Sequence, residues 1–382
     1  MAGYRLYGYS WEIRGSKQVA YLFGDKSIGE LYATLNGDWD GADLTLIAGG
    51  PPAQEFGLVN GYGWDSGRSK QVVFRTLDGH IHELYVRLGG EWSHEDLTAI
   101  AAAPPSNLYD EGIHAFSWEA GNAKQVVYKT SDGHLHELSV RFGEVWTHAD
   151  LTAISGSPPA YPVDADPFRK VHGYEDRLTG SKSLVYVAAD GHIHELAVSP
   201  GGKWQHADVT AIAGAPSVSI HSGEDNSICG FGWQAGAAKQ VVFRTVDGHL
   251  HELLFQRAGC LGPESTWQHV DMTAAASCPA AVFLLNGYAC EYGKSKHVLF
   301  LTGDSHIHEL SQTVGGAWMH SDLTAVTGAP IAEVASNGYS WEAGRSRQVV
   351  FLAVEPVGSG LLAVHELYLR EGDVWRHARL QA

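Results

Sequence analysis

The chain has 382 residues, 44% of them hydrophobic, and 43 acidic against 26 basic side chains give it a formal net charge of −17. Because this charge opposes phosphate backbones and no basic stripe offsets it, the sequence predicts no nucleic-acid partner. The chain has no run of eighteen apolar residues and no basic start followed by an apolar stretch, so we expect no membrane insertion and a protein that is cytoplasmic or exported without a classical signal peptide.

Residues 58–105 show most clearly the elements that recur along the chain. A run rich in β-branched and aromatic residues is followed by Asp78-Gly79, a strong signal for a tight hairpin turn. Gly89-Gly90 marks a second turn, and Pro104-Pro105 breaks the chain before the next copy. No stretch has a convincing helical period, so no helix beyond a single turn is expected. The unit is predicted to form four short antiparallel strands, at residues 58–64, 70–76, 80–86 and 91–100.

The unit occurs seven times. Each copy has a glutamate in its third strand and a tryptophan in its fourth, separated by nine residues in six copies and by fifteen in the fifth. A repeat of this length is typical of one supersecondary unit copied in an array. The glutamates are Glu30, Glu83, Glu137, Glu195, Glu252, Glu309 and Glu366. The tryptophans are Trp39, Trp92, Trp146, Trp204, Trp267, Trp318 and Trp375.

These repeats predict an all-β fold, a seven-bladed β-propeller of four-stranded antiparallel blades that forms one domain over residues 1–382. The alternative, a straight solenoid, would need capping repeats, whereas the first and last units are nearly full copies. We expect the small residues at 98–102 to line the axis, and the C-terminal segment to complete the blade begun by the N-terminus. The expected blades are 1–53, 54–106, 107–160, 161–217, 218–280, 281–331 and 332–382.

The repeated polar residues suggest a candidate ligand site. If Gly89-Gly90 is a two-residue turn, Glu83, Trp92 and His94 point to one face of the hairpin, toward a groove beside the next blade. A carboxylate, a lysine head and an aromatic plate are what a shallow carbohydrate pocket requires. The alternative is that the glutamate and tryptophan are a packing staple between blades. Besides the seven glutamates and seven tryptophans, the predicted sugar-binding residues are Lys70, Gln71, His94, His148, His206, His269 and His320.

The histidines also resemble a metal site. The pair His80 and His82 recurs in five units, and His94 would complete a set of three ligands. A two-residue turn, however, places His80 and His82 on the face opposite His94, so one blade would not bring them to one ion. We therefore expect no metal and no other cofactor, with the histidines hydrogen-bonded between blades. A metal site shared by adjacent blades is the alternative.

The remaining reactive residues indicate neither a zinc motif nor an active site. The four cysteines have no CxxC spacing, and free thiols are favoured over a bridge between Cys260 and Cys278. An enzyme should break the repeat with a unique constellation such as a carboxylate pair. The longest departures from the repeat offer acidic residues without a recognisable motif, namely Asp164, Asp166, Glu224 and Asp225.

Taken whole, the unit resembles the propeller lectins, above all the fucose-binding type of fungi and bacteria. The resemblance covers all seven units and consists of a β-branched second strand, an Asp-Gly turn, an Ile-x-Glu strand and Gly-Gly-x-Trp. It implies a sugar held between blades by the glutamate, by aromatic residues including the late tryptophan, and by a second-strand arginine. In this chain Gln71 takes the arginine's place, with Lys70 just before it, and the family usually has six units.

The sequence therefore predicts a multivalent, non-catalytic carbohydrate-binding protein that binds glycans or glycoconjugates. Several weak sites on one rigid disc would raise the avidity for clustered glycans. One alternative is a protein–protein interaction scaffold whose repeats are purely structural. The other is a metal-binding protein or glycan-active enzyme that uses the repeated histidines and glutamates.

Overall fold

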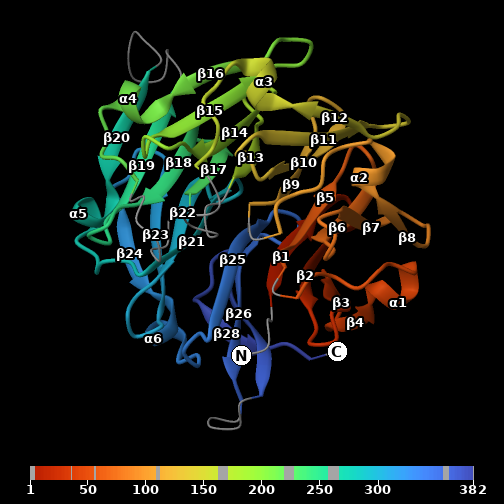
Figure 1. Cartoon of the computed structure of the whole chain (residues 1–382). Helices are drawn as coiled ribbons and strands as arrows, with labels where there is room; N and C mark the ends of the chain where they lie inside the picture. Colours follow the sequence, from red (N-terminus) through yellow and green to blue (C-terminus); the bar gives the residue numbers. More distant parts are fainter. Residues whose placement is uncertain are drawn as a thin grey trace.

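A computed structural model shows seven four-stranded antiparallel sheets arranged around a central axis (Figure 1). The structure describes residues 5–35, 37–55, 57–108, 112–161, 171–218, 228–256, 266–355 and 361–381. The predicted seven-bladed β-propeller is confirmed. Within the described ranges, no helix has the length and hydropathy needed to cross a membrane.

Each blade is built from four strands that are consecutive in the chain. The strands of blades 1 to 4 are β1 (Leu6–Trp11), β2 (Ser16–Leu22), β3 (Ile28–Thr34), β4 (Asp40–Asp43), β5 (Val59–Trp64), β6 (Ser69–Arg75), β7 (Ile81–Arg87), β8 (Trp92–Asp96), β9 (His114–Trp118), β10 (Ala123–Lys129), β11 (Leu135–Arg141), β12 (Thr147–Asp150), β13 (His172–Asp176), β14 (Ser181–Val187), β15 (Ile193–Val198) and β16 (Gln205–Asp208). Those of blades 5 to 7 are β17 (Ile228–Trp233), β18 (Ala238–Arg244), β19 (Leu250–Gln256), β20 (Trp267–Asp271), β21 (Phe283–Cys290), β22 (Ser295–Leu301), β23 (Ile307–Thr313), β24 (Met319–Asp322), β25 (Val334–Trp341), β26 (Ser346–Val354), β27 (Leu362–Arg370) and β28 (Arg376–Arg379).

A short helix follows the fourth strand in six blades. The aspartate that ends the strand caps it: the Asp96 side chain accepts a hydrogen bond from the Ala99 N–H at 2.9 Å. The fourth strand therefore ends at Asp96, and residues 98–102 run through α2 against β7 and β8 instead of lining the axis, so that prediction is wrong. The helices are α1 (Leu44–Ala48), α2 (Leu97–Ile100), α3 (Leu151–Ser155), α4 (Val209–Ala213), α5 (Met272–Ala276) and α6 (Leu323–Thr327), and η1 (Glu12–Arg14) is a 3-10 turn.

The turn between the third and fourth strands is centred one residue earlier than predicted. Leu84 pairs with His94 and Val86 with Trp92, whereas a Gly89-Gly90 turn would have paired Tyr85 with His94. The turn closes when the Gly90 N–H donates to the Arg87 carbonyl at 2.9 Å, and Gly89 takes a φ of 80° inside it. Because side chains alternate along a strand, this shift exchanges the two faces of the fourth strand relative to the third strand. Glu83 therefore points away from Trp92 and His94.

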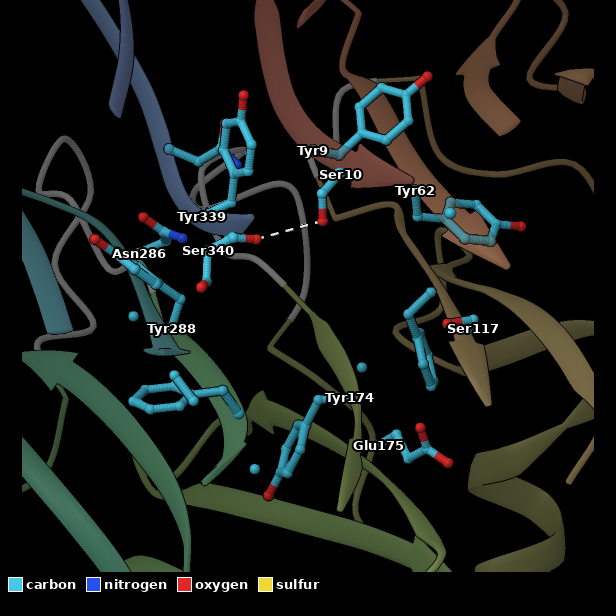
Figure 2. A pocket seen from close by; sticks show the side chains of 18 of the residues that line it. Tyr9, Ser10, Tyr62, Ser117, Tyr174, Glu175, Asn286, Tyr288, Tyr339 and Ser340 are labelled. Atoms are coloured by element: carbon cyan, nitrogen blue, oxygen red, sulfur yellow. Dashed lines mark hydrogen bonds between the residues drawn. The ribbon is translucent and has the colours of Figure 1, made fainter. Parts of the chain in front are cut away.

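The axis is lined by the first strand of every blade, and neighbouring first strands contact one another around the ring. Glycine permits this approach: a Cβ on Gly61 would lie 2.3 Å from the ring of Tyr9 in the preceding blade. Figure 2 shows the cavity of about 380 Å³ that these strands enclose, with Tyr9, Tyr62 and Tyr174 among its residues.

The ring closes without exchanging strands between its ends. β28 pairs with β27 and β1 with β2, so the prediction that the C-terminal segment completes the first blade is wrong. Each unit already supplies four strands, which leaves no position open. Closure instead uses Asn337 of β25, whose amide accepts from the Gly8 N–H and donates to the Gly8 carbonyl, both at 2.8 Å. Leu6, Leu380 and Tyr339 pack in the same seam.

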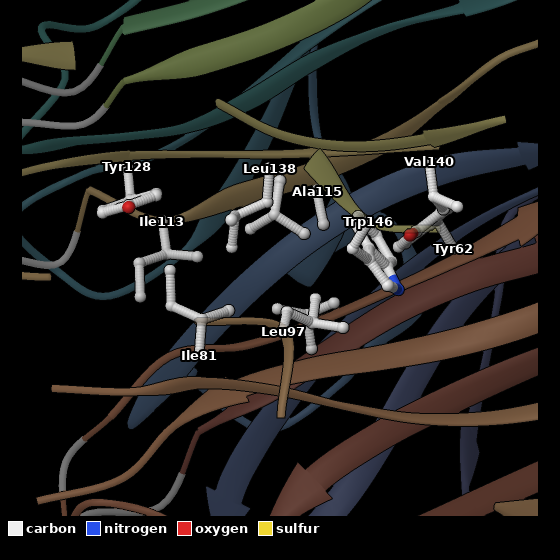
Figure 3. Packing of buried hydrophobic residues seen from close by; sticks show 11 residues of the cluster. Tyr62, Ile81, Leu97, Ile113, Ala115, Tyr128, Leu138, Val140 and Trp146 are labelled. Carbon is white, nitrogen blue, oxygen red and sulfur yellow. The ribbon is translucent and has the colours of Figure 1, made fainter. Parts of the chain in front are cut away.

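The hydrophobic core is divided among the interfaces between adjacent blades. Between blades 2 and 3, Tyr62 and Ile81 pack against Ile113, Tyr128 and Trp146 (Figure 3). Each blade thus buries both of its faces against its neighbours, which fixes the rotation of one blade against the next.

Replacement of Asn337 by alanine should weaken the closing seam. Asn337→Ala leaves the buried N–H and carbonyl of Gly8 without partners, which should lower the free energy of unfolding by about 2 kcal/mol in chemical denaturation. Ser10→Ala, at the same seam, removes a half-buried hydroxyl that lies 3.3 Å from the Ser340 carbonyl and also bonds the Glu12 side chain, and it should cost no more than about 1 kcal/mol. Equal losses in the two variants would contradict this account of closure.

Candidate ligand clefts between the blades

One buried ion pair crosses each interface between blades. The glutamate of the third strand accepts hydrogen bonds from the cation at the start of the second strand in the next blade; Glu83 pairs in this way with Lys124. The last pair joins blade 7 to blade 1, with Glu366 and Lys17 at N–O distances of 2.6 and 2.7 Å. The seven pairs are Glu30–Lys70, Glu83–Lys124, Glu137–Lys182, Glu195–Lys239, Glu252–Lys296, Glu309–Arg347 and Glu366–Lys17.

Aromatic rings surround each cation. Lys124 Nζ lies 5.8 Å from the Trp64 ring and 5.2 Å from the Tyr85 ring, both of blade 2, and 5.1 Å from the Trp146 ring of blade 3. Such contacts stabilise a partly desolvated ammonium. The tryptophan that ends the first strand therefore belongs to this site, which the sequence analysis missed. Its recurrence at one place in five units was the available signal, at Trp11, Trp64, Trp118, Trp233 and Trp341.

The structure sorts the sequence-predicted residues into different places. Trp92 does not meet Glu83; it lies 5.1 Å from Lys70, whose partner is Glu30. Gln71 has no exposed surface. The fourth-strand histidines lie away from the clefts, each beside a third-strand histidine at 2.8 to 2.9 Å, in the pairs His82–His94, His136–His148, His194–His206, His251–His269 and His308–His320.

The interface between blades 3 and 4 contains an open cleft of about 350 Å³. Its wall includes Glu137 and Lys182 together with Trp118 and Trp204, whose rings lie 4.7 and 5.2 Å from Lys182 Nζ. An acid, a cation and two indoles thus face one concave surface. The sequence analysis named these residue types but combined each glutamate with the tryptophan of its own hairpin, whereas Glu137 of blade 3 meets Trp204 of blade 4.

The glutamate of the pair is buried at every interface, with small differences in exposure that follow one nearby position, the residue two places after the glutamate. This residue is tyrosine at three interfaces, where the glutamates Glu83, Glu30 and Glu366 are 0%, 1% and 1% exposed. Where it is serine or alanine, at Ser139, Ala197 and Ser311, the glutamates are 5%, 4% and 3% exposed. The cleft between blades 2 and 3 is accordingly lined by Tyr85 and Lys124 but not by Glu83.

The pKa values of two of these glutamates are shifted in opposite directions. Burial raises the pKa of Glu83, because the loss of hydration outweighs the charge of Lys124. Burial also acts on Glu309, but Arg347 and His297 together hold the pKa of Glu309 below its usual range. His297 stands where five other blades carry glutamine and blade 4 carries Ser183, so this interface has a second basic group on its acid.

The histidines gather at the opposite end of the outer hairpin. In blade 2, His82 Nδ1 lies 2.9 Å from His94 Nε2, and His80 Nδ1 lies 2.8 Å from Asp96 Oδ2. The expectation that His82 and His94 occupy opposite faces is wrong, because it assumed a Gly89-Gly90 turn, whereas the observed register pairs Leu84 with His94. Burial lowers the pKa of His82, whereas the hydrogen bond to Asp96 raises the pKa of His80.

The axial cavity carries acidic side chains that the sequence analysis did not single out. Glu119 accepts from the N–H groups of Asp65 and Ser66 in the preceding blade at 3.0 and 2.8 Å. Glu12 likewise accepts from two N–H groups of blade 7. These carboxylates hold adjacent blades together, and burial raises the pKa of Glu12.

Two predictions fall partly or wholly outside the described residues. Asp164, Asp166, Glu224 and Asp225 lie there, as does Cys260. Cys229, Cys278 and Cys290 are free thiols.

The chain has structural relatives but no match to a family model or to a curated protein. The BP39L lectin of Burkholderia pseudomallei is similar over 100% of this chain and 99% of its own, with 14% identity and a TM-score of 0.66. The fucose-recognising, six-bladed lectin of Aleuria aurantia gives 16% identity over 84% and 95% of the two chains and a TM-score of 0.54. AofleA of Arthrobotrys oligospora gives 15% identity over 85% and 86%, with a TM-score of 0.52. These likenesses show the propeller fold, as the sequence resemblance implied.

Removal of one lysine should destabilise the ring strongly. Lys124→Met leaves the fully buried Glu83 carboxylate with only the Tyr62 hydroxyl at 3.2 Å, and should cost about 3 to 5 kcal/mol of unfolding free energy. The double variant Lys124→Met, Glu83→Gln should recover much of this loss, since no buried charge remains unpaired.

The loss should also depend on pH. A carboxyl whose pKa is higher in the folded chain contributes stability at low pH that is lost as the pH rises. Because burial already raises the pKa of Glu83 and Lys124→Met removes its cation, the deficit should be largest at neutral pH and shrink on acidification. Urea denaturation of both variants between neutral and mildly acidic pH measures this; a deficit independent of pH would contradict it.

Proposed function

We propose that this protein is a multivalent carbohydrate-binding protein, a lectin without catalytic activity, whose partners are glycans or glycoconjugates. The observation that carries the proposal is the cleft between blades 3 and 4, where Glu137, Lys182, Trp118 and Trp204 line one concavity. A carboxylate accepts from sugar hydroxyls, an ammonium donates to them, and an indole covers the apolar face of a sugar ring.

The chemistry of the cleft favours binding over catalysis. Glycoside hydrolases use two carboxyl groups flanking the scissile bond. This cleft has two carboxyl groups, Glu137 and Glu144, but Glu137 is paired with Lys182 at 2.5 Å. The same acid–cation pair recurs at every interface. An arrangement copied around a ring suits several equivalent weak sites better than a single catalytic centre.

The relatives supply the first sugar to test. The Aleuria aurantia lectin recognises fucose, and BP39L of Burkholderia pseudomallei is also a lectin. The resemblance implies an arginine at the sugar site, and its guanidinium would make bidentate hydrogen bonds. At six of the seven interfaces of this chain the cation is a lysine ammonium, which is a single point charge. We therefore expect a different pattern of preferred hydroxyls, with fucose as the reference compound.

We infer that a ligand reaches the ion pair where a small residue follows the glutamate. Ser139, Ala197 and Ser311 hold this position between blades 3 and 4, 4 and 5, and 6 and 7, whereas tyrosine holds it at three interfaces whose glutamates are 0% or 1% exposed. Three sites on one rigid disc would raise the avidity for clustered glycans through effective concentration.

A glycan array with the intact protein tests the function directly. We expect binding to a defined set of glycans, with signal that falls when the free monosaccharide competes. The variant that removes both members of the ion pair at these three interfaces (Glu137→Gln with Lys182→Met, Glu195→Gln with Lys239→Met, Glu309→Gln with Arg347→Met) leaves no buried charge unpaired. It should abolish binding while the thermal unfolding transition persists. Absence of binding to any glycan by the wild-type protein would favour the scaffold instead.

The proposed role of the residue two positions after the glutamate can be tested separately. The variant Ser139→Tyr, Ala197→Tyr, Ser311→Tyr should cover the three ion pairs as Tyr85 covers Glu83, and should lower avidity for an immobilised glycan by roughly 100-fold or more. The reciprocal variant Tyr85→Ser should open a further cleft and raise it. Surface plasmon resonance measures both; unchanged binding in the tyrosine variant would refute the assignment of these clefts.

A further inference from the structure

The outer corner of five blades carries a common set of potential metal ligands. Each has an aspartate in the hairpin turn, two histidines at the start of the third strand and an aspartate at the end of the fourth. In blade 2 these are Asp78, His80, His82 and Asp96. The corner lies at the end of the hairpin opposite the clefts, so it is not part of the proposed carbohydrate site.

The side chains approach one another closely enough to share an ion. Three ligand atoms, one from each residue, lie within 4.8 Å of one another in four clusters. Ligands of a tetrahedral Zn²⁺ at about 2.0 to 2.2 Å lie roughly 3 to 4 Å apart, so small side-chain rotations would complete the geometry. The clusters are His80, His82 and Asp96; Asp190, His194 and Asp208; His249, His251 and Asp271; and Asp304, His306 and His308.

The buried histidine of each cluster is oriented by groups around it. In blade 2, His82 lies in the interior with Nδ1 on His94, and the Asp96 carboxylate is held by the Ala99 N–H. Such outer contacts are what fix metal-binding imidazoles and carboxylates in place. His80 and Asp96 are 34% and 28% exposed, so an ion and its waters can enter from the edge of the disc.

Blade 4 presents the least obstructed cluster. In blade 2 the Nε2 of His82 bonds to the Thr76 hydroxyl at 3.1 Å, and that hydroxyl would have to turn away. Blade 4 has Ala188 at this position, and the Nε2 of His194 lies 3.3 Å from Asp190 Oδ2.

In blade 7 an arginine of the chain balances the negative charge at the corresponding corner. It has Arg379 where the other blades have the second aspartate, and the Arg379 guanidinium pairs with Glu355 at 3.3 Å. The Nε2 of His365, fully buried, lies 3.7 Å from the other oxygen of Glu355. A cation therefore stands beside the acid and imidazole in blade 7, while in blades 2 to 6 two carboxylates and two imidazoles share the corner.

We propose that these corners bind divalent transition-metal ions of the Zn²⁺ class, one per blade. Imidazole and carboxylate donors suit Zn²⁺, Co²⁺ and Ni²⁺ better than Mg²⁺ or Ca²⁺, which prefer oxygen alone. Blade 3 has the same residues, with His134 Nδ1 2.8 Å from Asp150 Oδ2. Blade 1 has Ser27, Gly29 and Gly41 at the histidine positions and binds none.

Titration of ZnCl₂ into tag-free protein, after treatment with a chelator, measures the sites by calorimetry and by metal analysis of the dialysed protein. We expect four ions per chain, or five with blade 3. Co²⁺ should give the visible absorption of a low-symmetry site. Binding of less than one equivalent would overturn the proposal and leave the histidines as hydrogen-bonding residues.

The half-exposed ligands supply the variants. His80→Gln should remove one equivalent. A combined variant that changes one exposed ligand of each corner should remove nearly all: His80→Gln, His134→Gln, Asp190→Asn, His249→Gln and His306→Gln. Asp25→Asn, in the corresponding turn of blade 1, is the matched control and should change nothing. Zinc stoichiometry that survives the combined variant, with the thermal transition intact, would assign the ions elsewhere and refute the proposal.

Discussion

The buried acid–cation pair that crosses every interface is the constraint on which the rest of the structure depends. Among the described residues all seven interfaces share this polar contact, and at the last interface Glu366 of blade 7 pairs with Lys17 of blade 1, in a ring that exchanges no strands between its ends. Charges removed from water cost more than their mutual attraction returns unless their geometry is well satisfied. Here tyrosine hydroxyls and aromatic rings supply the additional partners, as around Glu83 and Lys124. The pair therefore dictates how one blade meets the next more than it adds net stability.

The same pair explains how a structural contact becomes a candidate binding surface. Between blades 2 and 3, Tyr85 and Lys124 line the cleft without Glu83; between blades 3 and 4, where Ser139 replaces the tyrosine, both members of the pair line it. The two interpretations that the sequence left open, staple and ligand site, are thus not exclusive. One side chain beside the glutamate separates them, and the ion pair itself is unchanged.

The sequence predicted the fold well and the site only in part, for a physical reason. Seven copies of one unit reveal the blade directly, and Asp78-Gly79 places the central hairpin. The outer hairpin was misplaced because Gly89-Gly90 permits two turns, centred on either side of Gly89, and the sequence does not distinguish them. One residue of shift exchanges the two faces of a strand, so Glu83 and Trp92 were assigned to one interface when they serve two. Closure was missed although the repeat offers a signal: asparagine at the position of Asn337 recurs as Asn60 and Asn286, and Asn286 bonds Gly338 of the next blade as Asn337 bonds Gly8.

The two candidate sites are independent because they are assembled from different blades, although they share a face of each blade. Lys70, Trp92, His82 and Asp96 share one face of blade 2, while Glu83 and Tyr85 share the other. Every cleft thus combines the acid of one blade with the cation of the next, whereas every histidine corner is formed within a single blade. Blade 1 shows the consequence, because it has lost the histidines yet keeps Glu30 and Lys17 in their pairs. A repeat can therefore lose the corner without disturbing either of its interfaces, but it cannot lose its glutamate without leaving a buried cation of its neighbour unpaired.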